Sequence, residues 1–155
     1  GSILNESIKA QKILDSFGIG SDVWSATSFN MLRKDGMEND RFNELNPTSK
    51  QKITYVEECL PSSEIPVIAA TDYMRAYPEQ IRGFIKAPYY TLGTDGYGRS
   101  DSRQKLREFF EVDANNIARM AIYSLFRKGD ISKKEITSFY KKLKVDPSKP
   151  NPWEV

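Results

Sequence analysis

Pro66-Val67-Ile68-Ala69-Ala70-Thr71, with Asp72 directly after it, is the stretch of this sequence that decides the fold. An uninterrupted run of small apolar residues predicts a strand that is covered on both faces. One further strand is predicted on each side of it along the chain. The first spans residues 22–27, with β-favouring Val23 and Trp24, and the other spans residues 89–93.

Helical periodicity fills most of the chain around these strands, so strands and helices alternate. Helices are predicted over residues 8–17, 28–36, 42–45, 53–60, 73–86, 101–110, 113–129 and 132–143. Such alternation predicts an α/β fold of three layers (αβα), with helices on both faces of a mostly parallel or mixed sheet. Three strands are few for such a sheet, which leaves open a first strand upstream of Gly1.

Short capping patterns mark the ends of the predicted helices. Gly36 is expected to end the second helix, and Asp113 to cap the penultimate one. Ser132 begins a Ser-x-x-Glu capping box, and Asp101 begins a pattern that resembles one. The proline-rich tail over residues 147–152 is expected to run extended over the surface.

The length and composition are those of one ordinary soluble domain over residues 1–155. Hydrophobic residues make up 39% and charged residues 28%. No apolar run approaches the roughly 20 residues that span a bilayer, and no signal peptide is recognisable, so no membrane partner is expected. Cys59 is the only cysteine, which excludes an intrachain disulfide and favours a reducing, cytoplasmic compartment.

Charge and the absence of histidine narrow the function further. The net charge of +2 comes from interspersed acidic and basic residues, without the concentrated basic face that nucleic-acid binding needs. Without histidine, the chain has no Ser/His or Cys/His nucleophile pair and lacks the commonest transition-metal ligand. Acid–base chemistry by this chain alone would depend on Asp, Glu, Lys, Tyr or Cys59.

The glycine-rich loop over residues 93–101 is the leading candidate site. Ligands of open α/β sheets lie beyond the carboxyl ends of the strands, where residues 27–29, 71–73 and 93–101 are expected. The glycines of the last segment permit close backbone approach, and a helix N-terminus follows it. Its glycine order is not that of a dinucleotide-binding G-x-G-x-x-G motif, and no Lys-Ser/Thr pair follows as in a P-loop. The simplest interpretation is a solvated turn with a capping Asp101, while Arg99 with Asp101 suits a contact between domains better than a cofactor site.

Three other features have stronger structural interpretations. Asp72 could be catalytic, but an Asp in this position more often caps the next helix. Cys59 lies at an apolar helix position and is most simply a small buried hydrophobe. Aromatic residues at helical spacings are explained by core packing: Phe109, Phe110, Tyr123, Phe126, Phe139 and Tyr140.

Several segments, taken in order, resemble one enzyme family. They are residues 22–29 (Asp-Val-Trp-Ser-Ala-Thr-Ser-Phe), 70–75 (Ala-Thr-Asp-Tyr-Met-Arg), 93–101 (Gly-Thr-Asp-Gly-Tyr-Gly-Arg-Ser-Asp), 109–113 (Phe-Phe-Glu-Val-Asp) and 149–152 (Lys-Pro-Asn-Pro). Together they resemble the carboxy-terminal domain of the homodimeric pyruvate dehydrogenase decarboxylating component, over essentially the whole chain. More distantly, the glycine loop and the following helix are similar to the last domain of transketolases.

The resemblance implies the transketolase-like carboxy-terminal domain of a larger thiamine diphosphate enzyme. Members of this family decarboxylate pyruvate and pass the acetyl unit to a lipoyl group on the acyltransferase of a large complex. Their first two domains bind the cofactor and Mg²⁺ across a homodimer interface, while the carboxy-terminal domain supports the dimer and the edge of the active-site entrance. The expected partners are the other domains of the parent subunit, the homodimer partner and the lipoyl-bearing acyltransferase.

The resemblance carries no catalytic, cofactor-binding or metal residue onto this chain. The family's cofactor motif is Gly-Asp-Gly followed downstream by Asn, whereas Thr94-Asp95-Gly96 lacks the first glycine and lies too close to Asn115 and Asn116. Where family members are expected to carry histidines, this chain has Asn46 and Glu108. The residues expected at an interface or at the active-site entrance are Asp72, Tyr73, Asp95, Gly96, Tyr97, Gly98, Arg99, Ser100 and Asp101.

Two hypotheses of different classes remain open at this point. In the first, the chain is a structural and interface domain of pyruvate dehydrogenase, inactive alone and binding neither thiamine diphosphate nor Mg²⁺ by itself. In the second, it is a free-standing module whose loop 93–101 binds an anionic ligand or regulator through Arg99. A narrower alternative makes the parent a transketolase or another 2-oxo acid decarboxylating enzyme.

Overall fold

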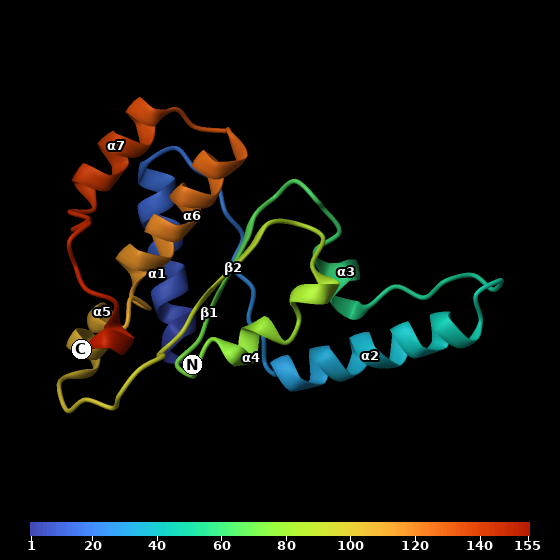
Figure 1. Cartoon of the computed structure of the whole chain (residues 1–155). Helices are drawn as coiled ribbons and strands as arrows, with labels where there is room; N and C mark the ends of the chain where they lie inside the picture. Colours follow the sequence, from blue (N-terminus) through green and yellow to red (C-terminus); the bar gives the residue numbers. More distant parts are fainter.

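The computed structural model describes residues 1–155 and shows two groups of helices on either side of a small sheet (Figure 1). The elements along the chain are α1 (Ser2–Ser16), α2 (Phe29–Leu45), α3 (Tyr55–Cys59), β1 (Val67–Ala70), α4 (Ala76–Glu79), the 3-10 turn η1 (Arg82–Phe84), β2 (Tyr89–Leu92), α5 (Arg103–Phe109), α6 (Ala114–Lys128), α7 (Lys133–Lys142) and the 3-10 turn η2 (Pro152–Glu154).

The sheet consists of β1 and β2, which run parallel, with Val67 opposite Tyr89 and Ala70 opposite Leu92. Both strands lie where the sequence predicts them, and the connection between them passes through α4 and η1. The Val67 N–H donates to the Pro88 carbonyl, next to β2. In a parallel pair only every second N–H group of a strand points to its neighbour, so the N–H groups in between on β1 point away from β2. Since the sheet contains only two strands, no strand lies beside this outer edge of β1.

Hydrophobic residues pack on both faces of this sheet, which confirms the three-layer α/β prediction. Even-numbered residues of β1, such as Ile68, contact a core built on α1 and α6 whose centre is the fully buried Ile122. Odd-numbered residues, such as Val67, contact a second core around Val56 and Ile81 on the side of α2, α3 and η1. The alternation follows from the period of two along a strand.

Residues 22–27 do not form the predicted third strand; they run as an irregular segment between α1 and α2, and Trp24 is 61% exposed. Their composition favours a β-strand because such side chains fit a pleated, half-buried surface. A strand also needs a neighbour that takes up its backbone hydrogen bonds. Within this chain no strand lies beside residues 22–27, so the composition alone is insufficient.

Gly36 does not end a helix, because α2 continues through it to Leu45 and merges the two predicted helices. Gly36 is buried, and a Cβ at this position would collide with the Phe84 ring of η1. The glycine thus lets an aromatic ring lie against the helix backbone. Its role is close packing rather than termination.

The predicted N-caps of α6 and α7 are correct, and that of α5 is wrong. Asp113 accepts from the Asn116 N–H at the start of α6, and Ser132 forms the predicted capping box of α7. Helix α5, however, begins later than predicted and is capped by Ser102, whose side chain accepts from the Lys105 N–H. Asp101 instead accepts from the Ser102 N–H at 2.7 Å, which orients the capping residue.

The helix predicted over residues 73–86 is broken into α4 and η1, and the predicted extended tail ends in η2. The aromatic residues are placed largely as expected: Phe139 stacks on Phe17 with ring centroids 4.7 Å apart, and Phe110 lies against the α1–α6 core. Cys59 is half-buried rather than buried. None of the helices combines the length and the apolar character needed to cross a membrane.

Candidate functional site

The loops that follow β1 and β2 are joined by three hydrogen bonds into one unit. The Thr94 N–H donates to the Tyr73 carbonyl at 2.9 Å, and the Thr94 hydroxyl donates to the Asp72 carbonyl at 2.8 Å. The Arg75 N–H donates to Asp95 Oδ1 at 3.1 Å. The expected juxtaposition of residues 71–73 and 93–101 at the carboxyl end of the sheet is therefore confirmed, and Asp95 serves to hold the two loops together.

Gly93 is required by the close approach of these loops. A Cβ built there would lie 2.7 Å from the Arg75 nitrogen and 2.7 Å from the Tyr73 carbonyl oxygen. Both atoms belong to the backbone, which cannot rotate aside as a side chain does. Only glycine fits at this contact without displacing one of the loops.

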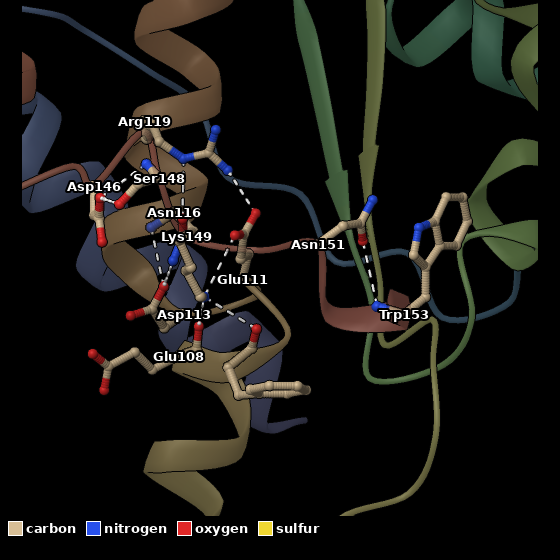
Figure 2. A network of polar contacts seen from close by, with 11 residues as sticks. Glu108, Glu111, Asp113, Asn116, Arg119, Asp146, Ser148, Lys149, Asn151 and Trp153 are labelled. Carbon is tan, nitrogen blue, oxygen red and sulfur yellow. Dashed lines mark hydrogen bonds and ion pairs between the residues drawn. The ribbon is translucent and has the colours of Figure 1, made fainter. Parts of the chain in front are cut away.

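The carboxy-terminal tail covers the next part of the glycine loop. Gly96 has φ +126°, a conformation that favours glycine, and a Cβ there would lie 3.1 Å from the Pro152 carbonyl oxygen. The tail segment that reaches it is η2, which Asn151 caps by accepting from the Trp153 N–H at 3.4 Å (Figure 2). Loop 93–101 is thus backed by the last residues of the chain.

Lys149 fastens this tail to the junction between α5 and α6. Its ammonium donates to the carbonyls of Glu108 at 2.8 Å and Phe109 at 3.1 Å, and lies 3.4 Å from a Glu111 carboxylate oxygen (Figure 2). A cation at the carbonyl end of a helix is favourably placed for the helix dipole. Arg119 of α6 binds the other Glu111 oxygen at 3.2 Å, so Glu111 bridges tail and helix.

Large side chains on the joined loops, on α4 and on η2 are exposed to solvent. The exposed fractions are 68% for Tyr73, 53% for Met74, 39% for Tyr77, 79% for Tyr97 and 55% for Trp153. We call these five residues, four of them aromatic, the aromatic rim. Tyr73 and Tyr77 contact each other, with ring centroids 5.3 Å apart. Exposed aromatic residues gathered on adjoining loops are typical of a surface that contacts another protein part.

Arg99 and Asp101 lie in a separate part of the loop and do not contact each other. The Arg99 guanidinium carbon lies 4.1 Å from the centre of the Phe109 ring, a cation–π contact that fixes its position. A shallow hollow of about 250 Å³ is lined there by Arg99, Ser100, Asp101, Lys105, Leu106 and Phe109. Gly98, in contrast, has open space around it.

Asp72 does not cap the following helix, so that structural interpretation is wrong. Its carboxylate accepts from the Ser2 hydroxyl at 2.8 Å, which links the β1 loop to the start of α1, and the N-cap position of α4 is Arg75. The reason is geometric, because residues 73–75 intervene between Asp72 and α4. The predicted helix begins at residue 73, directly after the strand, whereas α4 begins at Ala76.

The residues of this chain do not fit a magnesium diphosphate group. Asp95 is bound to the Arg75 N–H, whereas Asn116 lies on α6 and donates to Asp113 at 2.7 Å, so the two residues of the imperfect motif belong to different contacts. No group of three or more Cys, Asp or Glu residues is placed to hold a metal ion. Sequence reasoning missed Lys149 and Trp153, since the tail carries no pattern pointing to the loop.

Glu79 connects the site to the sheet through the strongest charge contact of this region. Its carboxylate accepts from Arg82 at 2.6 and 2.8 Å and from the Thr91 hydroxyl of β2 at 2.6 Å. The hydrogen bond from Arg82 lowers the pKa of Glu79 from 4.5 to about 2, against the opposing effect of burial. A lowered pKa adds stability that is complete above the unfolded-state pKa and is lost as the pH falls toward 2.

Glu79→Gln is therefore expected to lower the free energy of unfolding at pH 7 by about 1 kcal/mol, since the side chain is 37% exposed and solvent screens much of the interaction. The deficit should shrink as the pH is lowered from 4.5, because the wild-type carboxylate is then losing its own contribution. Urea unfolding at pH 7 and pH 3 checks this, and an equal deficit at both pH values would contradict it.

Comparison with known proteins places the chain in a family. Residues 1–113 match the family model of the transketolase-like TK C-terminal domain. The chain is 51% identical to the pyruvate dehydrogenase E1 component of Pseudomonas aeruginosa over 98% of its length, and 42% identical to that of Escherichia coli K12 over 98%. It spans only 18% and 17% of those two proteins. The resemblance seen in the sequence segments is thereby confirmed, and the chain belongs to the transketolase-like TK C-terminal domain family.

Proposed function

We propose that this chain is the carboxy-terminal structural and dimer-interface domain of a pyruvate dehydrogenase E1 component, and that it is inactive alone. The observation that carries the proposal is the 51% identity over 98% of the chain with a pyruvate dehydrogenase E1 component. The parent enzyme would decarboxylate pyruvate with thiamine diphosphate and Mg²⁺, and acetylate the lipoyl group of an acyltransferase within a cytoplasmic complex. In this proposal the cofactor lies in other domains of the parent.

The aromatic rim and loop 93–101 are the surface through which this domain would contact the rest of the enzyme. The backbone of the loop is held from behind by the close contact at Gly93, by the Arg75–Asp95 hydrogen bond and by the tail. Tyr97 is the most exposed residue of the rim, with 79% of its surface exposed. Aromatic side chains carried on an anchored backbone contribute strongly to interfaces, because they offer a large contact area with few rotatable bonds. Besides Tyr73 and Tyr97 of the rim, the proposed interface or active-site entrance includes Asp72, Asp95, Gly96, Gly98, Arg99, Ser100 and Asp101.

The small sheet supports the same proposal. The outer edge of β1 is free, and residues 22–27 have strand-like composition without a partner. We propose that the parent supplies a first strand beside β1 from the sequence preceding Gly1. The upstream reading frame tests this directly, since it should encode an apolar strand segment and, further upstream, a Gly-Asp-Gly…Asn motif.

Tyr97→Ala in the full-length parent is expected to lower activity about 10-fold while leaving the stability of the 155-residue chain unchanged, because an exposed side chain contributes little to its own fold. Tyr55→Ala is the matched control, since Tyr55 is 58% exposed on α3, away from the rim. Activity assays of the parent and urea unfolding of the chain provide the two measurements. Equal activities of the two variants would contradict the interface role, and stoichiometric binding of thiamine diphosphate and Mg²⁺ to the chain alone would contradict the proposed function itself.

A further inference from the structure

Residues 146–155, which come shortly after α7, form a strap that lies outside both cores of the molecule. Every residue in it is exposed except Pro152, which is half-buried. None of them contributes to the core around Ile122 or to the core around Val56. Figure 1 shows the chain after α7 returning along one side of the molecule to end beside α5. A segment that buries so little apolar surface depends on polar contacts for its position.

One side chain, that of Lys149, makes every hydrogen bond and ion pair between the strap and the rest of the molecule. The backbone bonds of the strap stay inside it, such as that from the Lys149 N–H to the Asp146 carbonyl at 3.3 Å. The side chains of Asp146 and Asn151 likewise accept only from residues of the strap (Figure 2). The strap therefore has a single polar anchor, at the end of α5 and at Glu111.

The anchor is strong for one side chain, yet it is open to solvent. An ammonium group that donates to carbonyls and a carboxylate makes charge-assisted hydrogen bonds, which are roughly twice as strong as neutral ones. The Lys149 and Glu111 side chains are 33% and 30% exposed, so water and salt ions reach the pair. Because the strap adds nothing to the cores, this anchor can open without disturbing them.

The strap covers the part of loop 93–101 that lies next to Tyr97. A Cβ on Gly96 would lie 3.1 Å from the Pro152 carbonyl oxygen and 3.2 Å from the Trp153 Cα atom, so the two backbones are in close contact. Trp153 is itself a residue of the aromatic rim. A closed strap thus brings Trp153 to the loop that carries Tyr97. An open strap would remove Trp153 from the rim and leave Gly96 uncovered.

We propose that the strap opens and closes, that Lys149 holds it closed, and that closure completes the aromatic rim. Lys149 is then a positioning residue, which acts on the rim through Trp153 and through the cover over Gly96. Since the proposed function makes the rim the contact surface for the rest of the parent, the role of closure rests on that function. A part of the parent that binds the complete rim also favours the closed strap, by linkage.

Lys149→Met tests the anchor, because methionine keeps the length of the side chain and removes its charge and its donors. In the 155-residue chain, ¹⁵N relaxation should show the backbone order parameters of Asn151, Trp153 and Glu154 falling from about 0.85 in the wild type to below about 0.6 in the variant. Lys149→Arg keeps the charge and the donors, so its order parameters should stay closer to the wild-type values.

The Gly96 amide resonance reports the cover over the loop. In Lys149→Met it should move more than halfway from its wild-type position toward its position in a chain truncated after Asp146, which lacks the strap. In 1 M salt the wild-type resonance should move in the same direction, by more than that of Lys149→Met. The reason is that the Debye length falls to about 3 Å, which weakens the ion pair with Glu111.

Lys134→Met is the matched control, since Lys134 is exposed on α7 and makes no ion pair, and both readouts should keep their wild-type values. The proposal is overturned if Lys149→Met leaves the strap as ordered as in the wild type, or if the wild-type strap is already as mobile as in that variant. A shift of the Ile122 resonances in Lys149→Met would show that the anchor supports the cores instead, which also overturns it. None of these results depends on the activity of the parent, so failure here and failure of the Tyr97 test are distinguishable.

Discussion

Gly93→Val is expected to lower the free energy of unfolding by about 3 kcal/mol, the upper part of the range for overpacking at a close contact. The new Cβ would lie 2.7 Å from backbone atoms of both Tyr73 and Arg75, so relief requires moving the β1 loop or the β2 loop. Such a movement also breaks the hydrogen bonds from Thr94 and to Asp95 that join the two loops. Urea unfolding of the 155-residue chain measures the loss.

Gly98→Val is the matched control, because it makes the same substitution within the same loop where a Cβ meets no atom within 4 Å. Its free energy of unfolding is expected to stay within about 0.5 kcal/mol of the wild-type value. If both variants were equally destabilised, the effect would come from stiffening the loop rather than from the contact of Gly93 with the β1 loop.

Ile122→Ala is expected to cost about 4 kcal/mol of stability. Ile122 is fully buried on α6, in the core shared with α1 and β2, where its removal leaves a cavity that the surrounding helices cannot close. Truncations of this kind cost about 2–5 kcal/mol, and the larger values belong to sites with rigid surroundings. The loss is measured by urea unfolding, with the slope of the transition checked for unchanged cooperativity.

Ile8→Ala removes the same atoms from α1 at a position that is 39% exposed. Its expected cost is about 1 kcal/mol, since 39% of its surface already reaches water in the folded state and less apolar area is lost. A cost for Ile122→Ala no greater than that for Ile8→Ala would mean that the core around α6 is loosely packed, contrary to its complete burial.

The two paired strands were predictable because their signal is local. The run from Val67 to Ala70 is apolar at every position. A strand in the middle of three layers packs both of its faces against a core, which suits such a run. The parallel arrangement followed from the helical segment between the strands. Residues 22–27 also contain β-favouring residues, yet no strand of this chain lies beside them to take up their backbone hydrogen bonds.

The helix boundaries show where local reasoning fails. Gly36 has the sequence character of a helix stop, but the Phe84 ring that packs on it lies 48 residues away and cannot be inferred from the helix itself. Helix α5 shows a smaller error of the same type, since either Asp101 or Ser102 is an acceptable cap and only the loop geometry selects Ser102.

The candidate site was predictable in position but not in its contacts. The topology of a parallel sheet places the loops after β1 and β2 together, and Gly93 to Asp101 was recognisable by its glycines. The support of that loop by Trp153 and Lys149 depends on the path of the tail, which no pattern in residues 147–152 specifies. Asp95 was recognised as a charged residue, but its role as an acceptor for the Arg75 N–H required the fold.

The free outer edge of β1 has a consequence for aggregation. Val67 to Ala70 contains no charged residue and no proline, and half of its N–H groups point away from β2, so nothing in the strand itself discourages the addition of a foreign strand. Natural proteins protect such edges with charges, bulges or covering segments. The first strand proposed above for the parent would give this protection, and separating the domain from it would expose a template for intermolecular β-pairing.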